Sequence, residues 1–272
     1  MALDLDGTVL RPDTTLSKKT IAVLKSCMDR GVRVILCTGR AVAGAEPYRA
    51  DIGAEGPMVY YNGAEVVDMP ACTVLSATLL DIETVDFCVD MARRMGVHFQ
   101  VFFPAVPGGP GETLMIEKDG PEAEMYRRHT GIQPVLGDLK KAIAGGKAPG
   151  CLKGMFIAEP VVQGEIRPIL EGRFGGRIYT ARTLAPFLEV MAPGASKGTG
   201  LLTAMGQRGL DAAGVLALGD EENDLPMFAV AGFSVAPANA GEKVRQAACE
   251  VAGSNAEDGI AAYLETFFSL DN

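Results

Sequence analysis

The chain has 272 residues, 48% hydrophobic and 22% charged, enough for one large domain or two modest ones with a substantial core. Its net charge of −9 argues against nucleic-acid binding, which needs clustered cations, but permits small anionic substrates because a bound metal ion reverses the local field. It shows no apolar run of membrane-spanning length, no secretory signal and no C-x-x-C pair among six scattered cysteines, so we expect a reduced, cytoplasmic protein that does not interact with membranes.

The first predicted elements alternate between strand and helix. A short buried strand ends at Asp4, and apolar residues recur at helical spacing between Ser17 and Arg30. Ser17 is suited to the N-cap of this helix, and Gly31 to the position after its end. The apolar run 34–37 is typical of a buried parallel strand. Strand, helix and strand in this order indicate a right-handed crossover unit.

The middle of the chain has elements of its own, which indicates an inserted second domain at 68–190. We expect a helix over 81–95 and a Pro/Gly-rich turn at 105–111. Strands are predicted at 98–103, 113–118, 151–159 and 186–193.

The last part returns to the pattern of the first. Short strands are predicted at 215–218 and 232–237, and helices at 240–248 and 260–268. We therefore expect residues 1–67 and 191–272 to form one doubly wound, Rossmann-like α/β domain with a parallel sheet.

Four polar stretches carry the candidate chemistry. They are DLDGT at Asp4–Thr8, TGR at Thr38–Arg40, SKG at Ser196–Gly198 and GDEEND at Gly219–Asp224. The first, second and fourth directly follow apolar runs. Because ligands bind beyond the carboxyl ends of parallel strands, we expect these stretches to converge on one edge of the sheet.

The carboxylates of these stretches favour a magnesium site. Asp4 and Asp6 at one strand end, with Asp220 and Asp224 at another, place like charges close together. A divalent cation relieves this repulsion, and Mg²⁺ prefers oxygen ligands.

The same residues suit phosphoryl transfer. Asp4 can attack phosphorus and form an aspartyl-phosphate, while Asp6 serves first as general acid and then as general base. Mg²⁺ and Lys197 neutralise the phosphoryl oxygens, and the Thr38 hydroxyl donates a hydrogen bond. Gly7 lets the backbone turn close to the phosphate, so the backbone N–H groups beyond it can also donate.

These stretches resemble the four motifs of the haloacid dehalogenase-like superfamily, specifically its Cof-type phosphatases, and the resemblance covers nearly the whole chain. The sequence YNGAEVVD at Tyr61–Asp68 is similar to the stretch before that family's inserted α/β cap domain. The resemblance implies that the cap is the segment 68–190, and that it closes over the site and selects the substrate.

The resemblance also implies a role for each site residue. Asp4 is the nucleophile and Asp6 the acid and base, and Mg²⁺ is held by Asp4, the backbone carbonyl of Asp6, and Asp220. By the same resemblance, Thr38, Gly39 and Lys197 bind the phosphoryl group. Asn223 contacts the phosphate or the nucleophile, and Asp224 orients Lys197 or a metal-bound water. Gly7 and Thr8 shape the first loop.

One departure concerns the first strand. Only three residues precede Asp4, fewer than the family usually has, so we expect this lead to fray; a start at an internal methionine is one interpretation.

Other polar residues have simpler interpretations. We expect Arg40 to be either a surface cation at a helix start or a member of the TGR motif, and assign it no catalytic role. Glu221 and Glu222 are expected to be exposed, and His98 and His129 to be structural or solvent-facing, since neither histidine has a second metal ligand near it in the sequence.

The leading hypothesis is a Mg²⁺-dependent phosphatase of small phosphorylated metabolites. A phosphomutase would use the same motifs, and a non-catalytic phospho-signalling protein also places an acidic pocket at strand ends, although such domains are shorter and have no inserted cap. Sugar phosphates, flavin mononucleotide, pyridoxal phosphate and erythrose 4-phosphate all stay open as substrates. No feature of the sequence predicts an oligomeric state.

Overall fold

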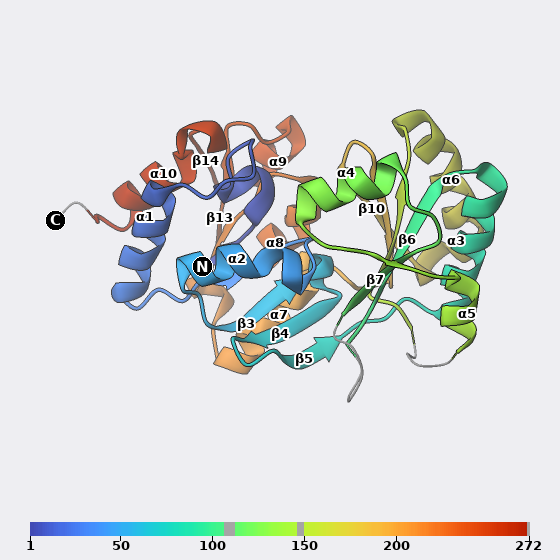
Figure 1. The fold of residues 1–272 in the computed structure, drawn as a ribbon. Helices are drawn as coiled ribbons and strands as arrows, with labels where there is room; N and C mark the ends of the chain where they lie inside the picture. Colours follow the sequence, from blue (N-terminus) through green and yellow to red (C-terminus); the bar gives the residue numbers. More distant parts are fainter. Residues whose placement is uncertain (106–111, 146–149, 271–272) are drawn as a thin grey trace. The chain divides into compact units, whose positions relative to one another are not determined.

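The computed structural model describes residues 1–105, 112–145 and 150–270, and Figure 1 shows the course of the chain. It divides into two compact units: Met1–Ser76 with Ser196–Asn272, and Ala77–Ala195. The second unit thus begins at Ala77 rather than at Asp68 and ends at Ala195 rather than at Val190.

A five-stranded parallel sheet forms the centre of the first unit. Its strands, in spatial order, are β14 (Glu250–Ala252), β13 (Phe233–Pro237), β12 (Leu216–Leu218), β1 (Ala2–Leu3) and β2 (Ile35–Leu36). The order places β1 between the two halves of the sheet, which is the doubly wound arrangement expected from the sequence.

The two-residue strand β1 is paired on both sides. Ala2 lies opposite Ala217 on one side and Ile35 on the other, and Ala2 and Leu3 are fully buried. The terminal ammonium of Met1 donates a hydrogen bond of 2.7 Å to the carbonyl oxygen of Arg33. The fraying expected for this strand is therefore not seen, because both neighbours hold it.

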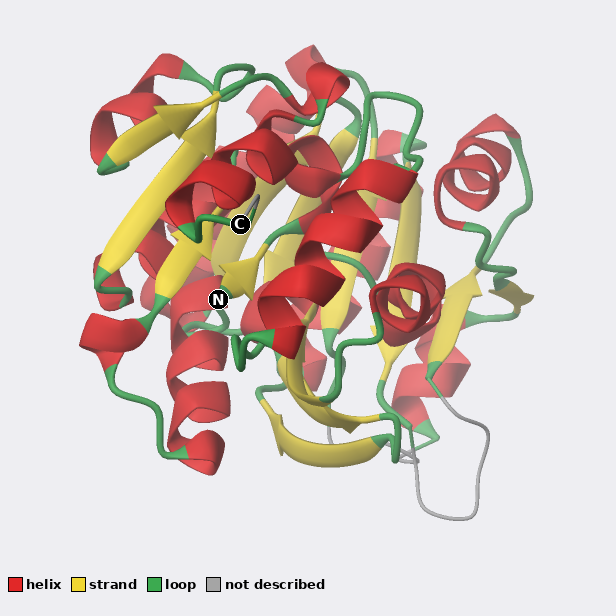
Figure 2. Ribbon diagram, turned by 90° about the vertical axis from the view of Figure 1, so that its left-hand side faces the viewer, coloured by secondary structure: helices red, strands yellow, loops and turns green. Residues whose placement is uncertain are grey.

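Helices cover both faces of the parallel sheet (Figure 2). Apolar residues of α7, α8 and α9 join the cluster that includes Ala2, Ile35 and Ala217, while α1 packs against α10 on the other face. Ser17 accepts a hydrogen bond from the backbone of Thr20, which confirms the predicted N-cap. The helices of this unit are α1 (Lys18–Asp29), α2 (Val42–Ile52), α7 (Lys197–Arg208), α8 (Leu225–Val230), α9 (Glu242–Ala247) and α10 (Gly259–Phe267).

A small antiparallel sheet, which the sequence analysis did not predict, explains the shifted boundary. Strands β3 (Gly56–Tyr60), β4 (Glu65–Met69) and β5 (Thr73–Ala77) form it in that order. Val59 and Val66 are part of the core of the first unit, and Leu75 packs against it. The chain therefore stays in the first unit until after this sheet.

The second unit is built on a six-stranded sheet, whose pairs are antiparallel except for β7 with β8. In spatial order the strands are β10 (Tyr179–Leu184), β11 (Phe187–Met191), β9 (Lys153–Ile157), β6 (His98–Phe103), β7 (Thr113–Ile116) and β8 (Val135–Leu136). Its helices are α3 (Ile82–Met95), α4 (Pro121–Thr130), α5 (Leu139–Ala144) and α6 (Pro160–Phe174).

The predicted helix and the four predicted strands of the insert are confirmed. The turn predicted at 105–111 lies outside the described residues apart from Ala105. His98 lies in β6, its ring 3.4 Å from the Gln100 side chain, and the His129 ring lies 6.0 Å from that of Phe187. Both histidines contact neighbours within this unit, as expected for structural residues.

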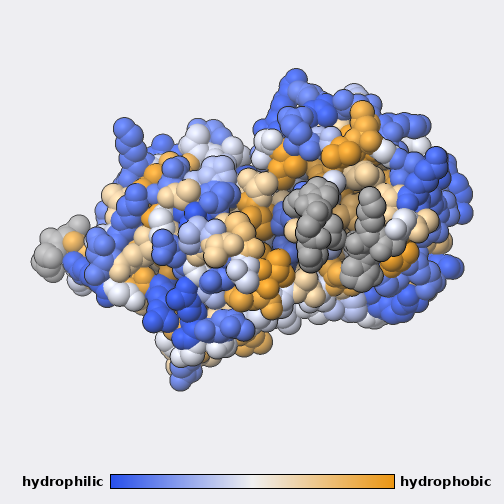
Figure 3. Space-filling view, turned by 60° about the horizontal axis from the view of Figure 1, so that its bottom comes forward, coloured by the Kyte–Doolittle hydropathy of each residue, from blue (hydrophilic) through white to orange (hydrophobic). Residues whose placement is uncertain are grey.

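The surface mixes polar and apolar residues. Large apolar side chains that are exposed, such as Val74, Leu136 and Phe267, belong to different elements, and the face in Figure 3 shows hydrophilic and hydrophobic residues interspersed. Within the described ranges, none of the helices combines the length and the hydropathy that crossing a membrane requires.

Candidate active site

The loops that follow three neighbouring strands carry the candidate residues. Asp4 follows β1, Thr38 lies two residues beyond β2, and Asp220 lies two residues beyond β12. The three strands are parallel and in register, so their carboxyl ends meet at one edge of the sheet. The structure thus brings the first, second and fourth stretches together.

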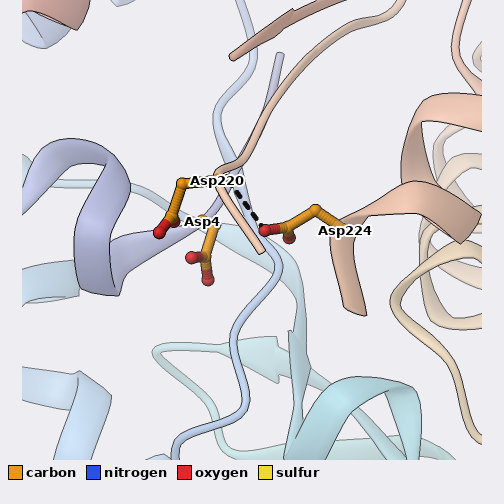
Figure 4. Close-up of side chains that lie close together, drawn as sticks. All are labelled: Asp4, Asp220 and Asp224. Atoms are coloured by element: carbon orange, nitrogen blue, oxygen red, sulfur yellow. Dashed lines mark hydrogen bonds between the residues drawn. The ribbon is translucent and has the colours of Figure 1, made fainter. Parts of the chain in front are cut away.

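Three aspartates form a buried acidic cluster at this edge. Asp4, Asp220 and Asp224 each offer a carboxylate oxygen, and these oxygens lie within 4.8 Å of one another. Figure 4 shows the three side chains gathered around the end of the loop, with Asp224 hydrogen-bonded to the backbone of Asp220. The Asp6 carboxylate, expected nearby, is not part of this cluster.

Lys197 joins two members of the cluster. Its Nζ lies 2.7 Å from Asp4 Oδ1 and 2.6 Å from Asp224 Oδ1, and only 1% of its side chain is exposed. Burial disfavours its ammonium form, but the carboxylates of Asp224 and Asp4 outweigh burial and raise the lysine's pKa. Lys197 therefore stays a fixed positive charge beside the candidate nucleophile.

The carboxylates differ in how the protein uses them. Asp224 accepts from Lys197 on Oδ1 and from the backbone N–H groups of Asp220 and Glu221 on Oδ2, at 2.9 and 3.1 Å. Asp220 accepts a 2.7 Å hydrogen bond from the Thr8 hydroxyl on Oδ1. Asp224 thus holds the loop and the lysine, while Asp4 and Asp220 keep carboxylate oxygens suited to binding a cation.

Burial and mutual repulsion raise the pKa values of Asp4 and Asp220, so that their ionisation is unfavourable without a cation. Burial, with repulsion from Asp224 and Asp220, raises the pKa of Asp4 well above its usual range, although Lys197 opposes this. Burial, followed by the charge of Asp224, raises the pKa of Asp220 to about 7. A hard divalent cation would favour the ionised forms, so oxygen donors and surplus negative charge both fit such an ion.

Gly7 lets Asp220 approach the first loop. Its φ of +75° is in the left-handed region, and a Cβ built on it would collide with the Asp220 carboxylate. Any side chain at this position would displace a candidate metal ligand.

Asp6 is held by Arg40 instead of facing the acidic cluster. Arg40 Nε and one terminal nitrogen donate to the two Asp6 oxygens at 2.7 and 2.6 Å, and the guanidinium lies 5.0 Å from the centre of the Tyr48 ring. Arg40 is 7% exposed, so the interpretation as a surface cation is wrong. Glu221 and Glu222, in contrast, are exposed as expected.

The second loop is buried and tied to a residue that the sequence analysis did not single out. The backbone N–H of Thr38, a fully buried residue, donates to Val59 O at 2.9 Å, and its carbonyl accepts from Asn62 N at 3.0 Å. A Cβ on Gly39 would lie 2.9 Å from Asn62 Oδ1. Asn223 Nδ2 also donates to Asn62 Oδ1, at 2.9 Å. The Asn-Gly pair at 62–63, typical of a left-handed turn, is the sequence signal that could have drawn attention to this residue.

Comparison with known proteins places the chain among hydrolases. A family model described as haloacid dehalogenase-like hydrolase matches residues 1–264. A 5-amino-6-(5-phospho-D-ribitylamino)uracil phosphatase of Bacillus subtilis, YitU, is 28% identical over 99% of this chain and 97% of its own length. An HMP-PP phosphatase of Serratia proteamaculans is 30% identical over 97% of this chain and 93% of its own.

Solved structures share the fold across both units. A haloacid dehalogenase-like hydrolase from Bacteroides thetaiotaomicron superposes with a TM-score of 0.86 at 24% identity, covering 98% of each chain. The TM0651 protein of Thermotoga maritima superposes with a TM-score of 0.81 at 27% identity, covering 97% of this chain and 96% of its own.

Proposed function

The chain belongs to the haloacid dehalogenase-like hydrolase family, and we propose that it is a Mg²⁺-dependent phosphatase of small phosphorylated metabolites that works through a phospho-Asp4 intermediate. The observation that carries the proposal is the contact of Asp4 with the buried ammonium of Lys197, inside a cluster of carboxylates at the edge of the sheet. Two phosphatases of small metabolites, aligned along nearly the whole chain, support the substrate class.

In the first step, a carboxylate oxygen of Asp4 attacks phosphorus, and the bond from phosphorus to the ester oxygen breaks. Lys197, fixed at 2.7 Å from Asp4, neutralises charge on the phosphoryl oxygens. The leaving alkoxide takes a proton from Asp6. Because Arg40 donates hydrogen bonds to both oxygens of Asp6, the Asp6 side chain must leave this ion pair to transfer the proton.

In the second step, water attacks the phosphorus of phospho-Asp4 and releases inorganic phosphate. Asp6, left ionised by the first step, takes the proton from this water. Asp4 returns as a carboxylate, so the two steps balance with one water consumed.

Asp4 and Asp220 would hold the magnesium ion, with the Asp6 carbonyl as a third ligand. When bound, Mg²⁺ supplies positive charge to the phosphoryl oxygens. Asp224 keeps Lys197 and the 220–221 backbone in place, and therefore supports the site without binding the ion itself.

The test is hydrolysis of p-nitrophenyl phosphate with and without Mg²⁺. We expect Asp4→Asn to lower kcat at least about 10³-fold, because the amide is not a nucleophile toward phosphorus. The control Asp51→Asn makes the same charge change at an exposed position of α2. Wild-type turnover in Asp4→Asn would exclude the phospho-Asp4 route. A separate screen of phosphorylated metabolites, in which the release of free phosphate is measured, would identify the substrate.

A further inference from the structure

The turn at Tyr61–Gly63 has a conformation that needs an explanation. Its three residues have φ angles of 50°, 54° and 93°, all in the left-handed region, and Tyr61 and Asn62 are at most 1% exposed. Asparagine tolerates this region, but tyrosine adopts it at a cost, so the conformation of Tyr61 persists only where the surroundings fix it.

The backbone of this turn is held by two loops of the active site. Tyr61 N–H donates to Arg40 O at 3.1 Å, and Asn62 N–H donates to Thr38 O. Gly63 packs so closely against the backbone of Ser196, the N-cap of α7, that a Cβ would collide with it. The direction of the Asn62 side chain is therefore set by main-chain contacts.

That side chain ends on Asn223. Asn62 Oδ1 accepts one hydrogen of the Asn223 amide, so the Asn223 side chain is fixed in one orientation. Asn223 Oδ1 is buried and has no hydrogen-bond partner within the described part of the chain. The second hydrogen of the Asn223 amide can donate to a phosphoryl oxygen, whereas Oδ1, an acceptor, is suited to a hydrogen-bond donor of the bound ligand.

We propose that Asn62 is a positioning residue for phosphate binding: its side-chain amide orients Asn223 toward the phosphoryl group. The inference depends on the proposed function, because it assumes that phosphate binds beside Asp4 and Lys197. It adds a link between the second and fourth loops, since Asn62 contacts both the Thr38–Gly39 backbone and Asn223.

The chain offers a substitution that separates the side chain from the backbone. Asn62→Gly keeps the left-handed conformation and the N–H bonded to Thr38, and removes only the amide. Cys72→Gly is the matched control, because Cys72 also has a φ of 54° but is exposed. Thermal unfolding of both variants reports whether the fold is retained.

The measurement is the affinity for inorganic phosphate, by titration calorimetry at saturating Mg²⁺. We expect Asn62→Gly to weaken binding about 10- to 100-fold, as for a lost hydrogen bond to a charged ligand, and Cys72→Gly to leave it unchanged. In an Asn223→Ala background, Asn62→Gly should have little further effect, since its action passes through Asn223.

Phosphate affinity within twofold of wild type in Asn62→Gly, or full additivity with Asn223→Ala, would overturn the inference. Wild-type protein that binds phosphate but hydrolyses no monoester would instead overturn the proposed function and leave the positioning role standing. Binding and turnover therefore separate the two.

Discussion

At the scale of single residues, the ion pair of Arg40 with Asp6 has a consequence for catalysis. Both Asp6 oxygens accept hydrogen bonds from the guanidinium, at 2.7 and 2.6 Å, so the Asp6 side chain is held in one orientation. The Asp6 side chain is 34% exposed, whereas that of Arg40 is 6% exposed. For Asp6 to act as the proposed acid and base, it is therefore the half-buried Asp6 side chain, and not the enclosed arginine, that has to move.

Gly7 gives the sharpest prediction at this scale. Gly7→Ala should remove most activation by Mg²⁺, because its Cβ collides with Asp220. Gly31→Ala is the control: it imposes the same backbone cost at φ +89°, but with no atom within 4 Å of its Cβ. Backbone strain should cost both variants roughly 1 kcal/mol of stability, and only Gly7→Ala should lose most of its activation by Mg²⁺. Equal Mg²⁺ dependence in activity titrations would contradict this account.

At the scale of elements, the start of α7 connects stability with chemistry. Ser196 accepts from Thr199 N at 3.1 Å, and Thr199 Oγ1 accepts from Ser196 N at 3.1 Å, which forms a reciprocal cap. Lys197 is the first residue of this helix. The cap therefore fixes the backbone from which the lysine reaches Asp4.

Removing this cap should affect activity as well as stability. We expect Ser196→Ala to cost about 1 kcal/mol and to lower kcat severalfold, because Lys197 loses its anchor. Ser17→Ala removes the equivalent cap of α1, where Ser17 accepts from Thr20 N, and should cost similar stability without changing kcat. Unfolding midpoints and initial rates for the two variants provide the comparison. If both variants lost kcat, or if neither did, the cap of α7 would have no specific effect on catalysis and this prediction would be wrong.

Elements with local signals were predictable, and those defined by distant partners were not. The cap at Ser17 and the apolar run before Gly219 depend on neighbouring residues, and the structure places α1 and β12 there. The sheet β3–β5 was not predicted because its strands are defined by packing against α7, which is distant in the sequence, and by the pairing of β3 with β4 along their whole length.

The same distinction applies to the site. The four motifs brought the acidic residues to attention, but Arg40 and Asn62 bind partners 34 and 161 positions away. A sequence pattern cannot distinguish a buried arginine such as Arg40 from a solvated one. The structure supplies the missing information because it shows that Arg40 is enclosed and which carboxylate it faces.

At the scale of the whole molecule, stability depends on whether the acidic cluster is ionised. The pKa of Asp220 is raised to about 7 in the folded protein, against about 3.9 in an unfolded chain. Between these values the folded state binds the proton more tightly, so the free energy of unfolding falls as pH rises from about 4 to 7. At about 1.4 kcal/mol per pKa unit, the loss is at most roughly 4 kcal/mol, and the raised pKa of Asp4 acts in the same direction.

Magnesium should reverse this loss, because it binds only the ionised carboxylates. We expect the rise in unfolding temperature caused by Mg²⁺ to be small at pH 5.5, where the ion competes with protons, and larger at pH 8. Asp220→Asn should abolish most of the rise at pH 8, whereas Glu222→Gln, at an exposed position in the same loop paired with Lys243, should keep it. Thermal scans of the wild type and both variants, at both pH values and with and without Mg²⁺, give the rises to be compared. A rise of equal size at pH 5.5 and pH 8 would mean that the ion binds elsewhere, since no site built from carboxylates with such raised pKa values can bind a cation independently of protons in this range.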